Sequence, residues 1–96
     1  MLFAVIAFDK ENSLPLRLAT RQAHFDYAKA TNCIKLGGPF LDVKGEMEGS
    51  LILFEAADLD AAKAWHAGDP YVKAGLFAHS EVRAWKPTFN PIDAAF

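Results

Sequence analysis

The sequence predicts a small α+β domain whose elements follow the order β-α-β-β-α-β. The chain has 96 residues, the size of one domain. Residues 2–8 and 51–54 are apolar throughout, as expected for strands that are buried on both faces. Residues 14–31 and 59–67 have helical patterns and lie between the predicted strands. This order is the ferredoxin-like pattern, with both helices on one face of a four-stranded antiparallel sheet.

The first half of that pattern begins with a strand over residues 2–8, followed by a long helix. Ser13 is the predicted N-cap of this helix, and Pro15 fits its first turn. The helix should continue to about Thr31, where Asn32 can end it in a left-handed conformation. Its apolar residues recur after roughly one or two helical turns; they are Leu14, Leu18, Phe25 and Ala28.

The two middle strands are predicted over residues 34–41 and 50–55, joined by a polar turn over 42–49. Gly37-Gly38-Pro39 interrupts the first of them. Glycine and proline inside a strand indicate a bulge or a close approach of another backbone.

The last part of the chain contains a short helix over residues 59–67, with Asp58 as its N-cap and Gly68 at its end. Asp69-Pro70 then starts one more helical turn, with the aspartate as cap and the proline in the first position. The final strand is predicted over residues 77–86.

The domain is predicted to span residues 1–88, and residues 89–96 form a C-terminal tail without periodicity. Apolar and aromatic residues make up 52% of a chain too short for a large core, which favours a second buried surface. The strands at 2–8 and 51–54 lack polar alternation, so the sheet face without helices is the expected interface. A two-fold homodimer with facing sheets, the dimeric α+β barrel arrangement, is the simplest solution.

Charge and composition exclude several classes of function. A net charge of −2 gives no general attraction to nucleic acid or anionic membranes, and no apolar run approaches the roughly 20 residues of a membrane span. Cys33 is the only cysteine, which excludes an internal disulfide and fits a reducing compartment. The N-terminal apolar run has neither the basic residues nor the cleavage site of a secretory signal. We therefore expect a cytoplasmic protein.

Chemistry-bearing side chains gather on the first helix. Arg17, Thr20, Arg21 and His24 are offset by three, four and seven positions, so they share one helical stripe. Two guanidinium groups beside an imidazole attract anions, but the same stripe can equally be a solvated helix face. Asp69 has two readings as well. It can simply cap its own turn, or it can orient a histidine that acts as a base. Spacing alone does not show that His24 and Asp69 meet.

Other polar residues give weaker signals. His66 and His79 have no metal-type spacing with His24, so neither a metal site nor a cofactor is expected. Ser50 lacks the glycine pattern of a catalytic nucleophile, although its hydroxyl could donate a hydrogen bond to a ligand. Gly37-Gly38-Pro39 is too short to cradle a phosphate.

In combination, several segments resemble the YciI-like (YCII-related) family. The matching segments are Asp9-Lys10, Ser13-Leu14, the run from Arg17 to His24, Gly38-Pro39, Gly49-Ser50, Asp69-Pro70-Tyr71 and Gly75. They occur in family order and extend almost to Lys86. This sequence departs from the family in its short 42–49 loop, and the tail after Lys86 has no counterpart there.

The resemblance implies a ferredoxin-like dimer with a His–Asp pair, formed here by His24 and Asp69. It further implies that Ser50 and the Gly38-Pro39 turn line the same cleft. We expect Tyr71, which follows Asp69-Pro70, and Arg17 and Arg21 of the helical stripe to bind the substrate as well. A related family member is a dehydrochlorinase acting on a chlorinated hydroxyquinol-type aromatic, and muconolactone isomerases have a similar dimeric α+β barrel. Fold likeness does not transfer a substrate.

Three functions therefore compete. The first is a cofactor-free lyase or isomerase, for example one like a dehydrochlorinase. In it, His24 moves a proton, Asp69 orients His24, and Arg17 or Arg21 holds an anionic cyclic or aromatic substrate. The second is a non-catalytic small-ligand-binding or accessory protein that uses the same residues only as hydrogen-bond partners. The third is a structural dimer without a ligand.

Overall fold

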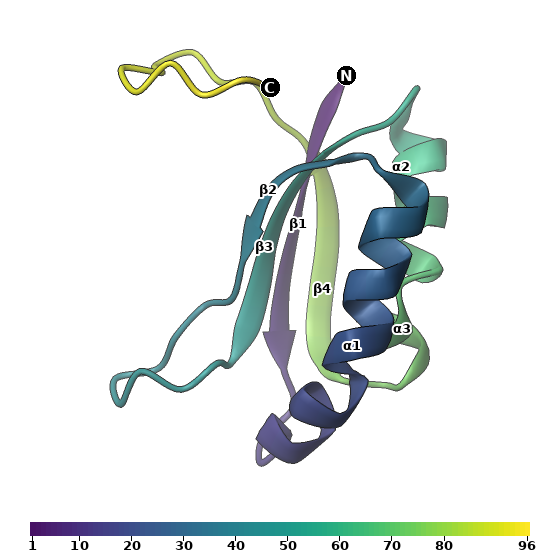
Figure 1. Cartoon of the computed structure of the whole chain (residues 1–96), viewed down its shortest axis with the longest axis vertical. Helices are drawn as coiled ribbons and strands as arrows, with labels where there is room; N and C mark the ends of the chain where they lie inside the picture. The colour runs from purple at the N-terminus through teal and green to yellow at the C-terminus, as the bar shows by residue number, and fades with distance from the viewer.

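A four-stranded antiparallel sheet with helices on one face forms the body of the protein in the computed structural model, which describes residues 1–96 (Figure 1). The elements are β1 (Leu2–Asp9), α1 (Leu14–Thr31), β2 (Ile34–Gly38), β3 (Gly49–Glu55), α2 (Leu59–Ala67), α3 (Pro70–Lys73) and β4 (Phe77–Ala84). The strand order is β2-β3-β1-β4, and every neighbouring pair is antiparallel. The predicted ferredoxin-like α+β fold is confirmed.

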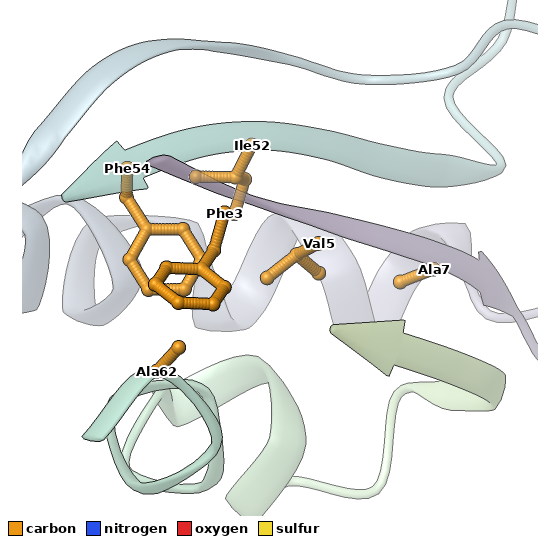
Figure 2. Close-up of a cluster of buried hydrophobic side chains, with 6 residues drawn as sticks. All are labelled: Phe3, Val5, Ala7, Ile52, Phe54 and Ala62. Carbon is orange, nitrogen blue, oxygen red and sulfur yellow. The ribbon is translucent and has the colours of Figure 1, made fainter. Parts of the chain in front are cut away.

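The hydrophobic core lies between β1, β3 and α2. Side chains alternate along a strand, so every second residue points to the helical face. Figure 2 shows the result: β1 and β3 direct their side chains toward the helix that carries Ala62. The buried cluster consists of Phe3, Val5, Ala7, Ile52, Phe54 and Ala62. Each large side chain buried here contributes roughly 1.5–3 kcal/mol to folding.

The opposite face of the sheet carries no helix. Phe8 is 46% exposed, Leu51 38% and Leu36 57%, and Phe8 stacks on Phe40 with ring centroids 5.5 Å apart. This open sheet face, defined here by Phe8, Leu36, Phe40 and Leu51, is the predicted dimer interface. None of the helices has both the length and the apolar character needed to cross a membrane.

Helix α1 has the predicted bounds, but its start is not capped as predicted. Ser13 occupies the N-cap position without a side-chain cap bond, because its hydroxyl donates to the carbonyl of Glu11 instead. Asn32 ends the helix in the left-handed conformation, with φ 50°, and its N–H donates to the carbonyl of Ala28.

The face of α1 that turns inward is polar, contrary to the apolar pattern of the sequence. Leu18 is 51% exposed and Phe25 is 42% exposed, whereas Arg17 and His24 are the buried residues of the helix. The apolar spacing thus predicted the helix correctly, but it does not identify the buried face of that helix. The inward face instead carries two of the polar side chains predicted to do chemistry.

Strand β2 ends at Gly38 rather than at Leu41. A register irregularity against β3 falls between Ile34 and Leu36, before the glycines, and Leu41 forms only an isolated bridge with Met47. The close backbone approach lies instead at Gly49, where a Cβ atom would collide with the carbonyl of Ala7. Gly49 thus lets β3 pair tightly with β1 directly before Ser50.

The second helix has the predicted bounds and caps. The Asp58 carboxylate accepts a hydrogen bond from the N–H of Ala61, and Gly68 ends the helix. Strand β4 stops at Ala84, two residues before the predicted end. Beyond it, the ring of Phe96 packs edge-on against Trp85, and the tail extends away from the helices (Figure 1).

Candidate functional site

The structure brings His24 of α1 beside Asp69, although 45 positions separate them. Helix α1 packs on α3, and Asp69 is the N-cap residue directly before α3. The His24 Nδ1 atom lies 2.9 Å from both Oδ1 and Oδ2 of Asp69. Asp69 is fully buried, and His24 is 9% exposed. Both side chains are therefore shielded from bulk water, which strengthens their interaction.

Asp69 makes the contacts that both of its predicted roles require. Its Oδ1 atom accepts a hydrogen bond from the N–H of Tyr71 at 2.9 Å, so it caps α3. The same carboxylate faces the imidazole of His24. A carboxylate can only accept, so the neutral imidazole carries its hydrogen on Nδ1. The Nε2 atom has no protein partner and keeps its lone pair free.

Tyr71 forms one side of the histidine's surroundings. Its ring stacks on the His24 ring, with centroids 4.2 Å apart and an 18° angle between the planes. The guanidinium of Arg17 lies 4.7 Å from the centroid of the Tyr71 ring. Burial raises the pKa of the Tyr71 phenol, and the positive charges of Arg17 and Arg21 oppose that shift. The phenol therefore remains protonated at neutral pH and can donate a hydrogen bond.

Arg17 is buried and already paired, unlike the exposed arginine that the sequence pattern allowed. Its Nε and Nη2 atoms donate to Asp9 Oδ2 and Oδ1 at 2.7 and 3.0 Å. Nη2 also donates to Ser50 Oγ at 2.8 Å. Sequence reasoning missed Asp9 as a site residue. The available signal was a lone carboxylate at the end of an apolar strand, and spacing did not connect it with the helix.

A cavity of about 380 Å³ lies between α1 and strands β2 and β3. The predicted residues that line it are Arg17, Arg21, His24, Gly38, Pro39, Ser50 and Tyr71. Asp69 is the one predicted site residue that does not line the cavity. It reaches the cavity only through its contact with His24. The rest of the wall consists of Gly37 and of apolar side chains, namely Phe25, Ala28, Ile34, Met47 and Ile52.

Arg21 differs from Arg17 in having no carboxylate partner. Its guanidinium lies 5.3 Å from the centroid of the Phe25 ring, at the exposed side of the cavity. The negative charge of Asp9 offsets the positive charge of Arg17. Arg21 is therefore the cation whose charge is available to bind an anionic ligand.

His66 lies outside this cavity, on α2. Its Nε2 atom is 3.0 Å from Ser80 Oγ, and its buried Nδ1 atom has no hydrogen-bond partner. Burial lowers the pKa of His66, and the charge of Asp69 opposes this only in part. No group of three or more His, Cys, Asp or Glu side chains is arranged to share a metal ion.

The lowered pKa of His66 predicts that acid destabilises the protein. The unfolded chain binds a proton at His66 below about pH 6.5, while the folded protein resists that proton until a lower pH. The free energy of unfolding should therefore fall as the pH drops below about 6.5. Urea unfolding at pH 7.5 and 5.5 measures the loss. His66→Gln should make this loss of unfolding free energy smaller. His79→Gln, at a side chain 65% exposed, should leave the loss unchanged. An unchanged loss in His66→Gln would contradict the assignment.

Comparison with known proteins gives a consistent pattern. Residues 1–86 match the family model of the YCII-related domain. Protein YciI from Escherichia coli (strain CFT073) is 34% identical over 98 residues, covering 93% of this chain and all of that protein. An uncharacterized protein from Haemophilus influenzae is 35% identical with the same coverage.

Among solved structures, a dehydrochlorinase is highly similar. It is the 5-chloro-2-hydroxyhydroquinone dehydrochlorinase TftG from Burkholderia phenoliruptrix, solved in complex with 2,5-dihydroxybenzoquinone. The identity is 35%, the TM-score is 0.83, and the match covers 90% of this chain and 94% of that one. An antibiotic biosynthesis monooxygenase matches with a TM-score of 0.57 over 90% of this chain and 97% of its own, but at 14% identity it supports the fold alone.

Proposed function

Because the chain belongs to the family of YCII-related domains, we propose that it is a dehydrochlorinase-like lyase that needs no cofactor. Its substrate would be a small, oxygen-substituted ring that binds in the cavity between α1 and the sheet. His24 would accept a proton from the substrate, Asp69 would orient His24, and Arg21 would hold an anionic oxygen. The similarity to the dehydrochlorinase supports the reaction class but does not fix the substrate.

The observation that carries this proposal is the free Nε2 atom of His24. Asp69 binds the hydrogen on Nδ1, which keeps Nε2 as an acceptor on a residue that lines the cavity. Loss of hydrogen chloride requires a base for the proton while the carbon–chlorine bond breaks and its electron pair leaves with chloride. When Nε2 takes the proton, the buried carboxylate of Asp69 stabilises the imidazolium that forms.

The remaining cavity residues would bind the substrate. Apolar side chains and the Gly38-Pro39 turn offer flat contacts to a ring, and the Tyr71 ring keeps the imidazole in place by stacking. The Arg21 guanidinium would attract a phenolate, the form in which acidic hydroxyquinols carry charge.

The test is chloride release from 5-chloro-2-hydroxyhydroquinone, followed with a chloride electrode and by the absorbance of the ring product. Chloride and ring product formed in equal amounts, in proportion to enzyme, support a lyase. The alternative is a non-catalytic small-ligand-binding or accessory protein, which the capping role of Asp69 allows. Saturable binding of chlorinated hydroquinones without any turnover would favour that alternative.

We also propose that two copies pair through the open sheet face. Its apolar side chains are 38–57% exposed at Leu51, Phe8 and Leu36, which is costly for a monomer in water. Both β1 and β3 supply this face, so a two-fold partner could bury it on both copies. The cytoplasmic location predicted from the single Cys33 stays a prediction.

The dimer should be visible by sedimentation at micromolar concentration, with about twice the mass of one 10.5 kDa chain. Leu51→Glu should convert it to a monomer, because a charge placed in that interface would lose its hydration. Leu59→Glu is the matched control, since Leu59 is 42% exposed on the helical face. A wild-type monomer, or a dimer that survives Leu51→Glu and dissociates with Leu59→Glu, would disprove the interface.

A further inference from the structure

We infer that Asp9 and Arg17 are positioning residues that turn the hydroxyl hydrogen of Ser50 into the cavity. The site would then select ring ligands that carry an acceptor oxygen, a carbonyl or phenolate, in addition to the group that faces His24. This inference rests on the proposed function only in taking the cavity as the substrate site.

The Arg17 side chain is held rigidly by Asp9. Asp9 lies at the end of β1 and binds the guanidinium through both carboxylate oxygens. The side chains of Arg17 and Asp9 are only 4% and 5% exposed. A bidentate pair fixes the plane of the guanidinium, and burial keeps water from competing for it.

The contact with Arg17 determines which way the Ser50 hydroxyl can donate. Arginine has donors but no acceptor, so in the 2.8 Å contact between Arg17 Nη2 and Ser50 Oγ the serine oxygen must accept. The hydroxyl hydrogen is left for another partner. Ser50 is 4% exposed, makes no other side-chain hydrogen bond and lines the cavity. A buried hydroxyl without an acceptor is unfavourable, so a ligand oxygen in the cavity is its natural partner.

The burial of this ion pair needs a reason beyond folding stability. Buried ion pairs lose their hydration, and apolar side chains of similar volume often stabilise a fold equally well. Stability alone therefore does not explain Asp9 and Arg17. The pair is explained by its effect on the positions of other side chains. Arg17 binds Ser50 and also lies over the Tyr71 ring, which stacks on His24. One guanidinium thus fixes the donor at Ser50 relative to the base at His24.

These groups together define the chemistry of the ligand. The cavity offers three kinds of polar group between largely apolar walls: hydroxyl donors at Ser50 and Tyr71, a lone pair at His24 Nε2 and a free cation at Arg21. A flat ring with at least two oxygen substituents satisfies all three. A suitable probe is 2,5-dihydroxybenzoquinone, because it is the ligand bound by the similar dehydrochlorinase.

The experiment is a double-mutant cycle on the affinity for 2,5-dihydroxybenzoquinone, measured by calorimetry with the full chain. Ser50→Ala and Arg17→Lys should each weaken binding by roughly tenfold, as for loss of one hydrogen bond to a ligand. The double variant should bind no more weakly than the weaker single variant, because Arg17 acts through Ser50. Ser13→Ala and Arg83→Lys are matched controls: the Ser13 hydroxyl caps nothing, and the Arg83 side chain is 68% exposed.

A second cycle keeps the inference testable if Arg17→Lys does not fold. Asp9→Asn removes the charge that fixes Arg17, and it should weaken binding in the wild-type background but not in Ser50→Ala. A purely structural Arg17 or Asp9 would lower the free energy of unfolding without this coupling in affinity.

Three outcomes would overturn the inference. The first is unchanged affinity in Ser50→Ala, and the second is a loss of affinity in each double variant that equals the product of its two single-variant losses. The third is no binding of 2,5-dihydroxybenzoquinone to the wild type. The last result would reject the ligand class, while the chloride assay judges proton transfer separately. Conversely, if the affinity losses are coupled but the protein never releases chloride, this inference stands and the lyase function is rejected.

Discussion

Replacing His24 with Asn is expected to lower kcat for chloride release by about 10²–10⁴-fold, the usual contribution of a general base. Asparagine can still donate its amide hydrogen to Asp69, so the buried carboxylate keeps a partner. It offers no nitrogen lone pair to the cavity in place of Nε2. The loss should therefore appear in kcat, with much less change in the affinity for 2,5-dihydroxybenzoquinone.

The control for this variant is His79→Asn, which changes the same residue type on β4 at a side chain 65% exposed. It should keep wild-type kcat. Asp69→Asn should also reduce kcat, because an amide can donate a hydrogen bond to His24 Nδ1 and so stabilise the tautomer with the hydrogen on Nε2. If His24→Asn retained wild-type turnover in a folded protein, the histidine would not be the base.

Much of the fold could be predicted because the local signals agreed with one another. Helix α2 matched its predicted bounds since a capping aspartate, Asp58, and a terminal glycine, Gly68, bracket it. The end of α1 at Asn32 was equally clear, because asparagine tolerates the left-handed conformation that stops a helix. The two apolar runs were predicted as strands because they are short and are followed by charged residues, Asp9 and Glu55.

The orientation of α1 could not be predicted in the same way. Hydrophobic periodicity predicted that a helix forms here, but it does not show which side of the helix is buried. Leu18 and Phe25, two of the apolar residues that define the period, are 51% and 42% exposed. In the structure Arg17 is buried because Asp9 neutralises it, and His24 because Asp69 binds it. Each pair joins a helix to a residue outside it, so no pattern within the helix reveals either partner.

Asp69 illustrates a second limit of sequence reasoning. Its place before Pro70 is fully accounted for by capping, and the structure has that cap. The contact with His24 arises only because α1 and α3 pack side by side, which is a property of the whole fold. The sequence likewise does not show that Ser50 and Arg21 line one cavity, because the sheet and α1 form that cavity together.

The buried pair of Asp9 and Arg17 yields the largest expected effect on stability. Arg17→Met should lower the free energy of unfolding by roughly 3–5 kcal/mol, because it leaves the Asp9 carboxylate buried without a counter-charge. The cost arises from the stranded charge rather than from lost packing, since methionine fills much of the same volume. Urea unfolding at pH 7.5 measures it.

The decisive comparison is the double variant Asp9→Leu with Arg17→Met. If the stranded carboxylate causes the loss, replacing both charges with apolar side chains should recover most of the wild-type stability. Arg83→Met, at a side chain 68% exposed, should change stability by no more than about 0.5 kcal/mol. A double variant as unstable as Arg17→Met alone would mean that Arg17 stabilises the fold by packing, for instance over the Tyr71 ring. Recovery of stability together with loss of affinity for 2,5-dihydroxybenzoquinone would separate the two roles: the ion pair would be dispensable for folding and required for the orientation of Ser50.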